Sequence, residues 1–160
     1  MGLLVLSGCG YAFRGGVVNL PPGAHSLTIP VFANNTSEAG IETTFTNDLT
    51  FEFNRSKALR VSAPPADLVL SGAIDQILVE PVAYSQSVVA VERRVVLKVS
   101  AKLTETATGA IIWEDRGIID NEVFSVAGDP STTERNRRDA IVRIAERVAS
   151  QIHNRALEGF

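Results

Sequence analysis

Two stretches of the chain carry apolar residues at helical spacing. Between about Gly40 and Arg55 the apolar residues return at every fourth position, as Ile41, Phe45, Leu49 and Phe53. A second stripe, in residues 131–160, contains Ile141, Ile144, Ala145, Val148 and Ile152. Residues at this spacing lie along one side of an α-helix. The pattern therefore predicts two amphipathic helices, the second beginning with a capping box at Ser131-Thr132-Thr133-Glu134.

Four other stretches favour β-strands, at residues 26–32, 67–80, 91–103 and 110–124. The cleanest alternation is in 91–103, where Val95, Leu97 and Val99 share one side with other apolar residues. Cations and a serine occupy the other side, which is typical of a half-exposed antiparallel strand. Residues 67–80 alternate less clearly, so we expect a strand covered mostly on both faces and ended by Pro81.

The predicted order of elements is β-α-β-β-β-α, which makes the fold class α+β. The first strand should run parallel to the second, because a helix connects them, and the last three strands should form a meander. Both helices need an apolar partner surface. We therefore expect a four-stranded mixed sheet with two helices packed on one face, in a single α/β sandwich domain over residues 24–160.

Composition narrows the class of protein. The chain has 160 residues, of which 45% are hydrophobic and 21% charged, and its net charge is −3. These values are typical of one folded domain and exclude a disordered chain or a protein with many membrane spans. Duplex nucleic acid is a poor partner, since proteins that bind it are usually strongly basic.

The only cysteine is Cys9, which follows an apolar run that ends in Leu6-Ser7-Gly8. This tetrad resembles the lipobox of bacterial lipoproteins, in which the cysteine carries a lipid. We expect residues 1–8 to be a truncated lipoprotein signal peptide, residues 9–23 a lipidated tether, and the membrane to be reached through the N-terminal lipid. The alternative is that Cys9 is a free thiol without a special role.

Residues that carry catalytic or metal chemistry do not form a recognisable set. His25 and His153 lie near opposite ends of the chain, and with a single cysteine the sequence offers no zinc motif. Neither a phosphate-binding glycine loop nor a Gly-x-Ser-x-Gly nucleophile motif is present. The sequence therefore predicts a protein that is not an enzyme and that needs no metal or cofactor.

Basic residues are the better candidates for binding. Arg94, Lys98 and Lys102 fall on one face of the strand at 91–103, with Arg93 at its start, and such a row binds anionic groups such as phosphates. The alternative is an ordinary solvated face, paired with acids on a neighbouring strand. Near the start of the last helix lie Arg135, Arg137 and Arg138, where cations oppose the helix dipole. This favours a binding role slightly more than for cations elsewhere, while a solvated face is the default interpretation.

Three stretches resemble the LptE family of lipopolysaccharide-assembly lipoproteins. They are Cys9-Gly10-Tyr11-Ala12-Phe13-Arg14, then Ile29-Pro30-Val31-Phe32-Ala33-Asn34-Asn35-Thr36-Ser37-Glu38, and the opening of the last helix from Glu134-Arg135-Asn136 through Ala145-Glu146-Arg147. The resemblance implies an outer-membrane lipoprotein that faces the periplasm. It also implies a plug inside the β-barrel of LptD, which would help that barrel to assemble and bind lipopolysaccharide.

The family's basic residues lie in two loops, one entering the third predicted strand and one before the last helix. Arg93 and Arg94 match the first loop. Residues 126–130 contain no cation, and Arg135 lies just beyond them. The resemblance therefore makes Arg93, Arg94, Lys98, Lys102 and Arg135 the candidate lipopolysaccharide-binding residues.

Two other functions remain open from the sequence. A lipoprotein adaptor that activates a cell-wall synthase, or another envelope-assembly machine, shares a lipobox and a Val-Phe-x-Asn-x-Thr type of strand end. Such an adaptor would bind protein and not glycolipid. A small envelope hydrolase is the weakest interpretation, because no catalytic set is visible.

Overall fold

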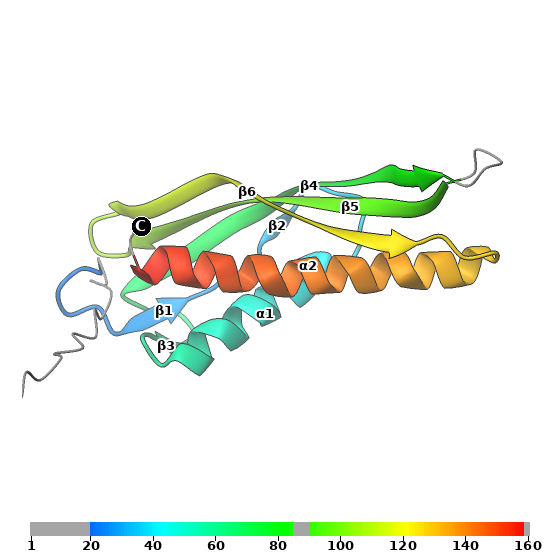
Figure 1. Cartoon of the computed structure of the whole chain (residues 1–160). Helices are drawn as coiled ribbons and strands as arrows, with labels where there is room; N and C mark the ends of the chain where they lie inside the picture. Colours follow the sequence, from blue (N-terminus) through cyan, green and yellow to red (C-terminus); the bar gives the residue numbers. More distant parts are fainter. Residues whose placement is uncertain (1–19, 85–89, 159–160) are drawn as a thin grey trace, which may run out of the picture.

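The structure is a computed structural model, and it describes residues 20–84 and 90–158. Its elements follow the order β1 (Ser26–Thr28), β2 (Ala33–Asn34), α1 (Ile41–Ser56), β3 (Arg60–Val61), β4 (Leu68–Tyr84), β5 (Ala90–Glu105), β6 (Ile111–Ser125) and α2 (Pro130–Glu158). Figure 1 shows an elongated arrangement in which α2 runs along the length of the long strands β4, β5 and β6. The signal peptide and Cys9 of the sequence prediction lie outside the described residues.

The sheet has the strand order β3-β1-β4-β5-β6, and β2 also pairs with β4. β1 runs parallel to β4, while β4, β5 and β6 form an antiparallel meander, so the predicted mixed sheet is confirmed. The predicted number of four strands is wrong, because the sheet has six. β2 and β3 are two residues long and too short to show an alternation, and Pro30 separates β2 from β1 because it has no amide hydrogen to donate.

β4 continues to Tyr84 and does not end at Pro81 as the sequence predicts. Beyond Gln76 the described residues of β4 pair only with β5, so Pro81 sits on an edge strand, and the ladder is irregular just after it. Proline is tolerated at such positions, where its missing amide hydrogen costs little. The expected cover on both faces is also wrong beyond Ile74, because most side chains from Gln76 onward are exposed.

One face of the sheet carries the core, as predicted. Alternate residues of β5, including Val95, Leu97 and Val99, are buried on the face that both helices cover. Phe45 of α1 is fully buried there, and the ring of Phe32 meets it edge-on at 5.3 Å between centroids. No element of the described residues covers the opposite face, which we call the open face (Figure 1).

The start of α2 differs from the predicted capping box. The helix begins at Pro130, a residue favoured at the first helical position, and Asp129 caps it. Oδ1 of Asp129 accepts hydrogen bonds from the Thr132 amide at 2.8 Å and the Ser131 hydroxyl at 2.6 Å. These hydrogen bonds lower the pKa of Asp129 to about 2, and the bond from Ser131 has the largest effect. Asp129 therefore takes the capping role that the sequence prediction gave to Ser131 and Glu134.

The two ends of the domain carry different features. The described chain begins beside the end of α2 and the turn between β5 and β6 (Figure 1). There the Thr106 amide donates to the carbonyl oxygen of Asp67 at 2.8 Å. The end of β4, the start of β5 and the loop between β6 and α2 lie at the other end, which we call the far end (Figure 1).

Candidate functional site

Three of the predicted cations lie on the open face, in the arrangement expected from the alternation of β5. In the register with β6, Arg94 is opposite Val123, Lys98 opposite Ile119 and Lys102 opposite Glu114. Successive cations are four residues apart, which corresponds to about 13 Å along a strand. Arg94, Lys98 and Lys102 therefore form an extended row and not one compact site.

Arg93 lies on the other face of the sheet, although it is adjacent to Arg94 in sequence. It is paired with the buried residue Phe124 of β6. Together with residues 126–130 and the first turns of α2, it lines a pocket of about 300 Å³ at the far end. Arg137 lines this pocket and Arg135 does not, so the structure does not bring the five candidate cations into a single pocket.

Most arginines of α2 hold the fold together. Arg143 binds Glu122 at 2.9 Å, Arg147 binds Asp120 at 2.8 Å, and Arg155 binds Asp115 at 2.7 Å. All three acids are on the helix-facing side of β6, so the pairs join the edge strand to the helix. The hydrogen bond with Arg143 is the first cause that lowers the pKa of Glu122.

Arg137 and Arg138 also form ion pairs, so their position near the helix start has a structural explanation. Arg137 binds Glu38 at 2.6 Å and Glu134 at 2.8 Å, and Arg138 binds Glu134 at 2.9 Å. The hydrogen bonds with Glu134 and then Glu38 raise the pKa of Arg137 above its ordinary value. The cost of placing a cation near the helix start is offset by these acids.

The five candidate cations differ from these arginines. Within residues 20–84 and 90–158, Arg93, Arg94, Lys98, Lys102 and Arg135 form no ion pair at 4.0 Å or less. Glu80 and Glu114 lie opposite Arg94 and Lys102 in the register, yet Glu114 binds Arg116 at 2.8 Å instead. Nε of Arg94 is shielded from solvent and has no hydrogen-bond partner among the described residues. The anion-binding capacity of these side chains is not used within the described structure.

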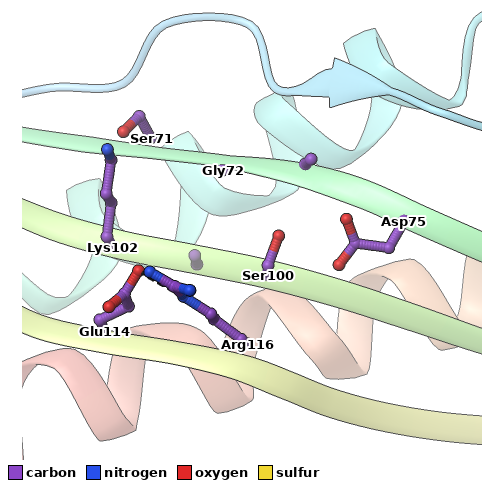
Figure 2. A pocket seen from close by; sticks show the side chains of 9 residues that line it. Ser71, Gly72, Asp75, Ser100, Lys102, Glu114 and Arg116 are labelled. Carbon is purple, nitrogen blue, oxygen red and sulfur yellow. Dashed lines mark hydrogen bonds and ion pairs between the residues drawn. The ribbon is translucent and has the colours of Figure 1, made fainter.

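A shallow pocket of about 360 Å³ lies on the half of the open face that is away from the far end. Figure 2 shows Ser71, Gly72 and Ser100 along it, with Glu114 and Arg116 near Lys102 and with Asp75 further along. The strands approach closely here, because a Cβ atom on Gly72 would overlap the Ser100 carbonyl oxygen. Acids and cations are mixed in this pocket, so it has less preference for anions than the row alone suggests.

Other site chemistry is limited in the described residues. His153 packs edge-on against the ring of Phe53 at 4.8 Å between centroids, which is a structural contact. The part of the chain that the structure describes contains no group of three His, Cys, Asp or Glu side chains suited to a metal ion. In the same part, neither helix combines the length and apolar character needed to cross a membrane.

Comparison with known protein families assigns the chain to one of them. The family model LptE, described as lipopolysaccharide-assembly, matches residues 24–156, which is most of the domain. The chain belongs to the LptE family. This confirms the resemblance seen in the sequence and places the chain in a family of lipopolysaccharide-assembly lipoproteins that are not enzymes.

Solved structures support the fold. Lipoprotein B from Nitrosomonas europaea has a TM-score of 0.57 at 15% identity, with 91% of each chain covered. The PelC dodecamer from Paraburkholderia phytofirmans has a TM-score of 0.54 at 15% identity, covering 87% of this chain and 91% of that one. A minor lipoprotein from Acinetobacter baumannii has a TM-score of 0.51 at 17% identity, covering 86% of this chain and 96% of that one. No curated protein matches the sequence.

Proposed function

We propose that this LptE-family protein is an outer-membrane lipoprotein, lipid-anchored at Cys9 on the periplasmic face, that binds lipopolysaccharide and plugs the LptD β-barrel while helping it to assemble. The observation that carries the lipopolysaccharide part is the division among the cations. The arginines of α2 from Arg137 onward are paired with acids, whereas the five candidates form no ion pair within the described residues. The protein acts by binding and not by catalysis.

Lipopolysaccharide suits these side chains because its phosphates offer several acceptor oxygens to a charged donor. Charge-assisted hydrogen bonds of this kind are about twice as strong as neutral ones. Arg94 adds a specific reason, since its shielded Nε has a hydrogen to donate and no described partner to accept it. A phosphate oxygen could accept this hydrogen bond if the guanidinium turned so that Nε became accessible.

The elongated form of the domain supports the plug. α2 has 29 residues, which corresponds to a length of about 43 Å, and the three long strands extend beside it (Figure 1). A narrow domain of this kind can lie lengthwise inside a wide barrel. The charged residues of its surface would then face the polar interior that large barrels have.

The lipopolysaccharide part is tested with the full chain and a double variant, Arg94→Glu with Lys98→Glu, because these two cations lie on the same face of the sheet. We expect about tenfold weaker binding of lipopolysaccharide, because two charges near the ligand are reversed. Arg138→Glu is the matched control, since Arg138 is 72% exposed and pairs only with Glu134 among the described residues. Wild-type protein that binds no lipopolysaccharide, or a double variant that binds as well as the control, contradicts this part.

The partner and the anchor need separate tests. Pull-down from native membranes should recover a large barrel protein, and recovery of a cell-wall synthase in its place would support an adaptor. Replacement of Cys9 by Ala should shift the protein out of the membrane fraction, because the lipid is the proposed attachment. Unchanged membrane association of that variant would contradict anchoring at Cys9.

A further inference from the structure

The outer edge of β4 has no neighbouring strand along its far half. β1 and β2 pair with β4 only as far as Ile74. From Gln76 onward the described residues of β4 pair with β5 alone, so the other side of the strand is open (Figure 1). A bulge at Asp75 begins this stretch, and the ladder becomes irregular after Pro81. We call Gln76, Ile77, Leu78, Val79 and Glu80 the free edge.

The opposite edge of the sheet is covered by α2. On β6, the carbonyl oxygen of Asn121 accepts a hydrogen bond from Arg147 at 2.8 Å, and that of Ser125 accepts one from Asn136 at 2.9 Å. Among residues 20–84 and 90–158, no side chain makes a comparable bond to the backbone of the free edge. An edge strand left open in this way is a template for another strand.

The alternation of the ladder indicates which backbone groups of the free edge point outward. Residues of a strand direct their N–H and C=O groups to one neighbour and then to the other. The carbonyl of Ile74 points outward, because it accepts a hydrogen bond from the Asn35 amide at 3.0 Å. Asp75 is an extra residue in the ladder, which shifts the alternation by one. Ile77 and Val79 therefore direct their N–H and C=O groups to the open side.

Pro81 fits the same alternation. It is the next residue expected to face outward, and its partner in the ladder with β5 is Arg93. Proline has no amide hydrogen and is confined in sheets to positions where no strand needs one. An outward-facing Pro81 therefore removes no bond to β5. It also ends the row of outward donors, so the complete pairs of donor and acceptor are those of Ile77 and Val79.

These donors and acceptors are arranged symmetrically about Leu78. In an antiparallel pair of two copies centred on this residue, Ile77 lies opposite Val79 of the second copy, and Val79 opposite Ile77. Each outward N–H group then meets an outward C=O group. A pair centred on Glu80 would instead place two carboxylates opposite each other, which is unfavourable. A pair centred on Val79 would leave the Ile77 carbonyl facing Pro81, which has no hydrogen to donate.

The side chains of the free edge also suit a second copy. Leu78 is 42% exposed on the open face, and Val79 is 39% exposed on the face that carries the core. Pairing about Leu78 brings the two leucines together at the symmetry axis and covers part of this apolar surface. Gln76 would lie opposite Glu80, the one charged residue of the free edge, and could donate a hydrogen bond to it.

We propose that two copies of this chain pair along the free edge, antiparallel and centred on Leu78, so that their sheets become continuous. This contact goes beyond the proposed function, which makes no use of the free edge. An extended segment of a different protein is the alternative occupant. It is less favoured, because a second copy accounts for the symmetric arrangement of donors and acceptors without any further assumption.

The pairing is tested by analytical ultracentrifugation of the purified full chain in detergent. The wild type should form dimers in proportions that rise with protein concentration. Leu78→Lys should raise the dissociation constant at least about tenfold, because two like charges would meet at the symmetry axis. Val82→Lys is the matched control, since Val82 is 41% exposed on the same strand and lies outside the free edge. Circular dichroism should show that all three proteins are folded.

Two further variants test the register. Leu78→Glu alone should also be monomeric, but a mixture of Leu78→Glu with Leu78→Lys should restore dimers, because opposite charges then meet across the axis. Leu78→Cys, in a Cys9→Ala background, should form a disulfide-linked dimer on oxidation. Residues opposite each other without mutual hydrogen bonds have Cα atoms about 4.5 Å apart, which lies within the disulfide range. Val82→Cys in the same background should remain unlinked.

The outcomes distinguish a second copy from a different partner. Wild-type protein that stays monomeric at every concentration overturns the proposal. A dimer that Leu78→Lys leaves intact, or a charge mixture that restores none, overturns pairing about Leu78. If the wild type is monomeric and Leu78→Lys no longer recovers a protein that the wild type recovers from membranes, the free edge binds that protein and the second copy is wrong. None of these results bears on lipopolysaccharide binding, which is measured with other variants.

Discussion

Arg137 binds both carboxylate oxygens of Glu38, a residue 99 positions earlier in the chain. Nη1 is 2.6 Å from Oε1 and Nη2 is 3.1 Å from Oε2. Glu38 belongs to the segment between β2 and α1, while Arg137 is in the second turn of α2. Both side chains are largely buried, so this bidentate pair fixes the start of the long helix to the rest of the domain.

Replacement of Arg137 by Ala should therefore destabilise the domain. We expect a loss of about 2 kcal/mol in the free energy of unfolding, because Glu38 is left partly buried without its partner. Urea denaturation measures the change. The control is Arg138→Ala, an exposed residue whose loss should cost less than about 0.5 kcal/mol. Equal losses in the two variants would contradict a structural role for the Glu38 pair.

Gly72 should not tolerate a side chain. A Cβ atom at this position would overlap the Ser100 carbonyl oxygen and lie 2.5 Å from the ring of Phe32. We expect Gly72→Ala to reduce the free energy of unfolding by more than about 2 kcal/mol, because the backbone of β5 would have to move. Gly128→Ala is the control, since a Cβ atom there would meet no other side chain or backbone within 4 Å. A stability of Gly72→Ala within experimental error of wild type would refute the close approach.

Asp48 should make the folded domain less stable as the pH rises. Its burial, followed by repulsion from Glu146 and Glu52, raises the pKa of Asp48 from 3.8 to about 6. The folded protein then holds a proton that the unfolded chain releases, so stability falls as the pH rises from about 4 to about 6. We expect Asp48→Asn to raise the free energy of unfolding by about 1 kcal/mol at pH 7.5, after allowance for solvent screening, and to change it little at pH 4.

The measurement is urea denaturation of both proteins at the two pH values. Asp139→Asn serves as a control on the exposed side of α2, with an expected change below about 0.5 kcal/mol at either pH. A gain for Asp48→Asn that is the same at pH 4 and pH 7.5 would show that the carboxylate charge is not its cause.

Asp67 should show the opposite dependence. Its Oδ2 accepts hydrogen bonds from the amides of His25 and Ser26, both at 2.9 Å, and from the Ser26 hydroxyl at 2.7 Å. The bond from His25 is the first cause that lowers the pKa of Asp67 below 3.8. The carboxylate therefore stabilises the fold above pH 3.8, and this contribution is lost as the pH falls through the lowered pKa.

Asp67→Ala should accordingly unfold at a lower temperature than wild type at pH 7, and the difference should narrow below pH 3.8. Thermal unfolding followed by circular dichroism at several pH values gives the result. A difference that stays constant down to the lowest pH would mean that the side chain matters for packing and not for its charge.

Repeating patterns made much of the fold predictable from sequence. The stripe through Phe45 and Leu49 and the alternation around Val95 each extend over several turns or residues, and both gave elements close to those observed. The two-residue strands have no such pattern. The cap at Asp129 was missed because Ser131 and Glu134 fit the spacing of a capping box. Pro130 settled the choice, since it fixes the start of the helix two residues earlier.

The candidate cations were only partly predictable. Alternation along β5 places Arg94, Lys98 and Lys102 on one face, and the structure agrees. The same alternation places Arg93 and Arg94 on opposite faces of the sheet, because they are adjacent in the strand. The resemblance to the family's loop gave both residues one role and did not distinguish the two faces. Which arginines are already paired depends on contacts such as that with Glu38, and sequence spacing cannot reveal an acid 99 residues away.

The length of α2 fixes the distance between the two ends of the domain. The described chain starts beside the last turn of this helix, whereas Arg93 lies near its first turns at the far end. A helix of 29 residues spans about 43 Å and resists bending, so under the proposed function it would be a rigid spacer between the lipid-anchored end of the domain and the cations at the far end. A longer tether would let the whole spacer swing more widely, but it would not alter the separation that the spacer imposes.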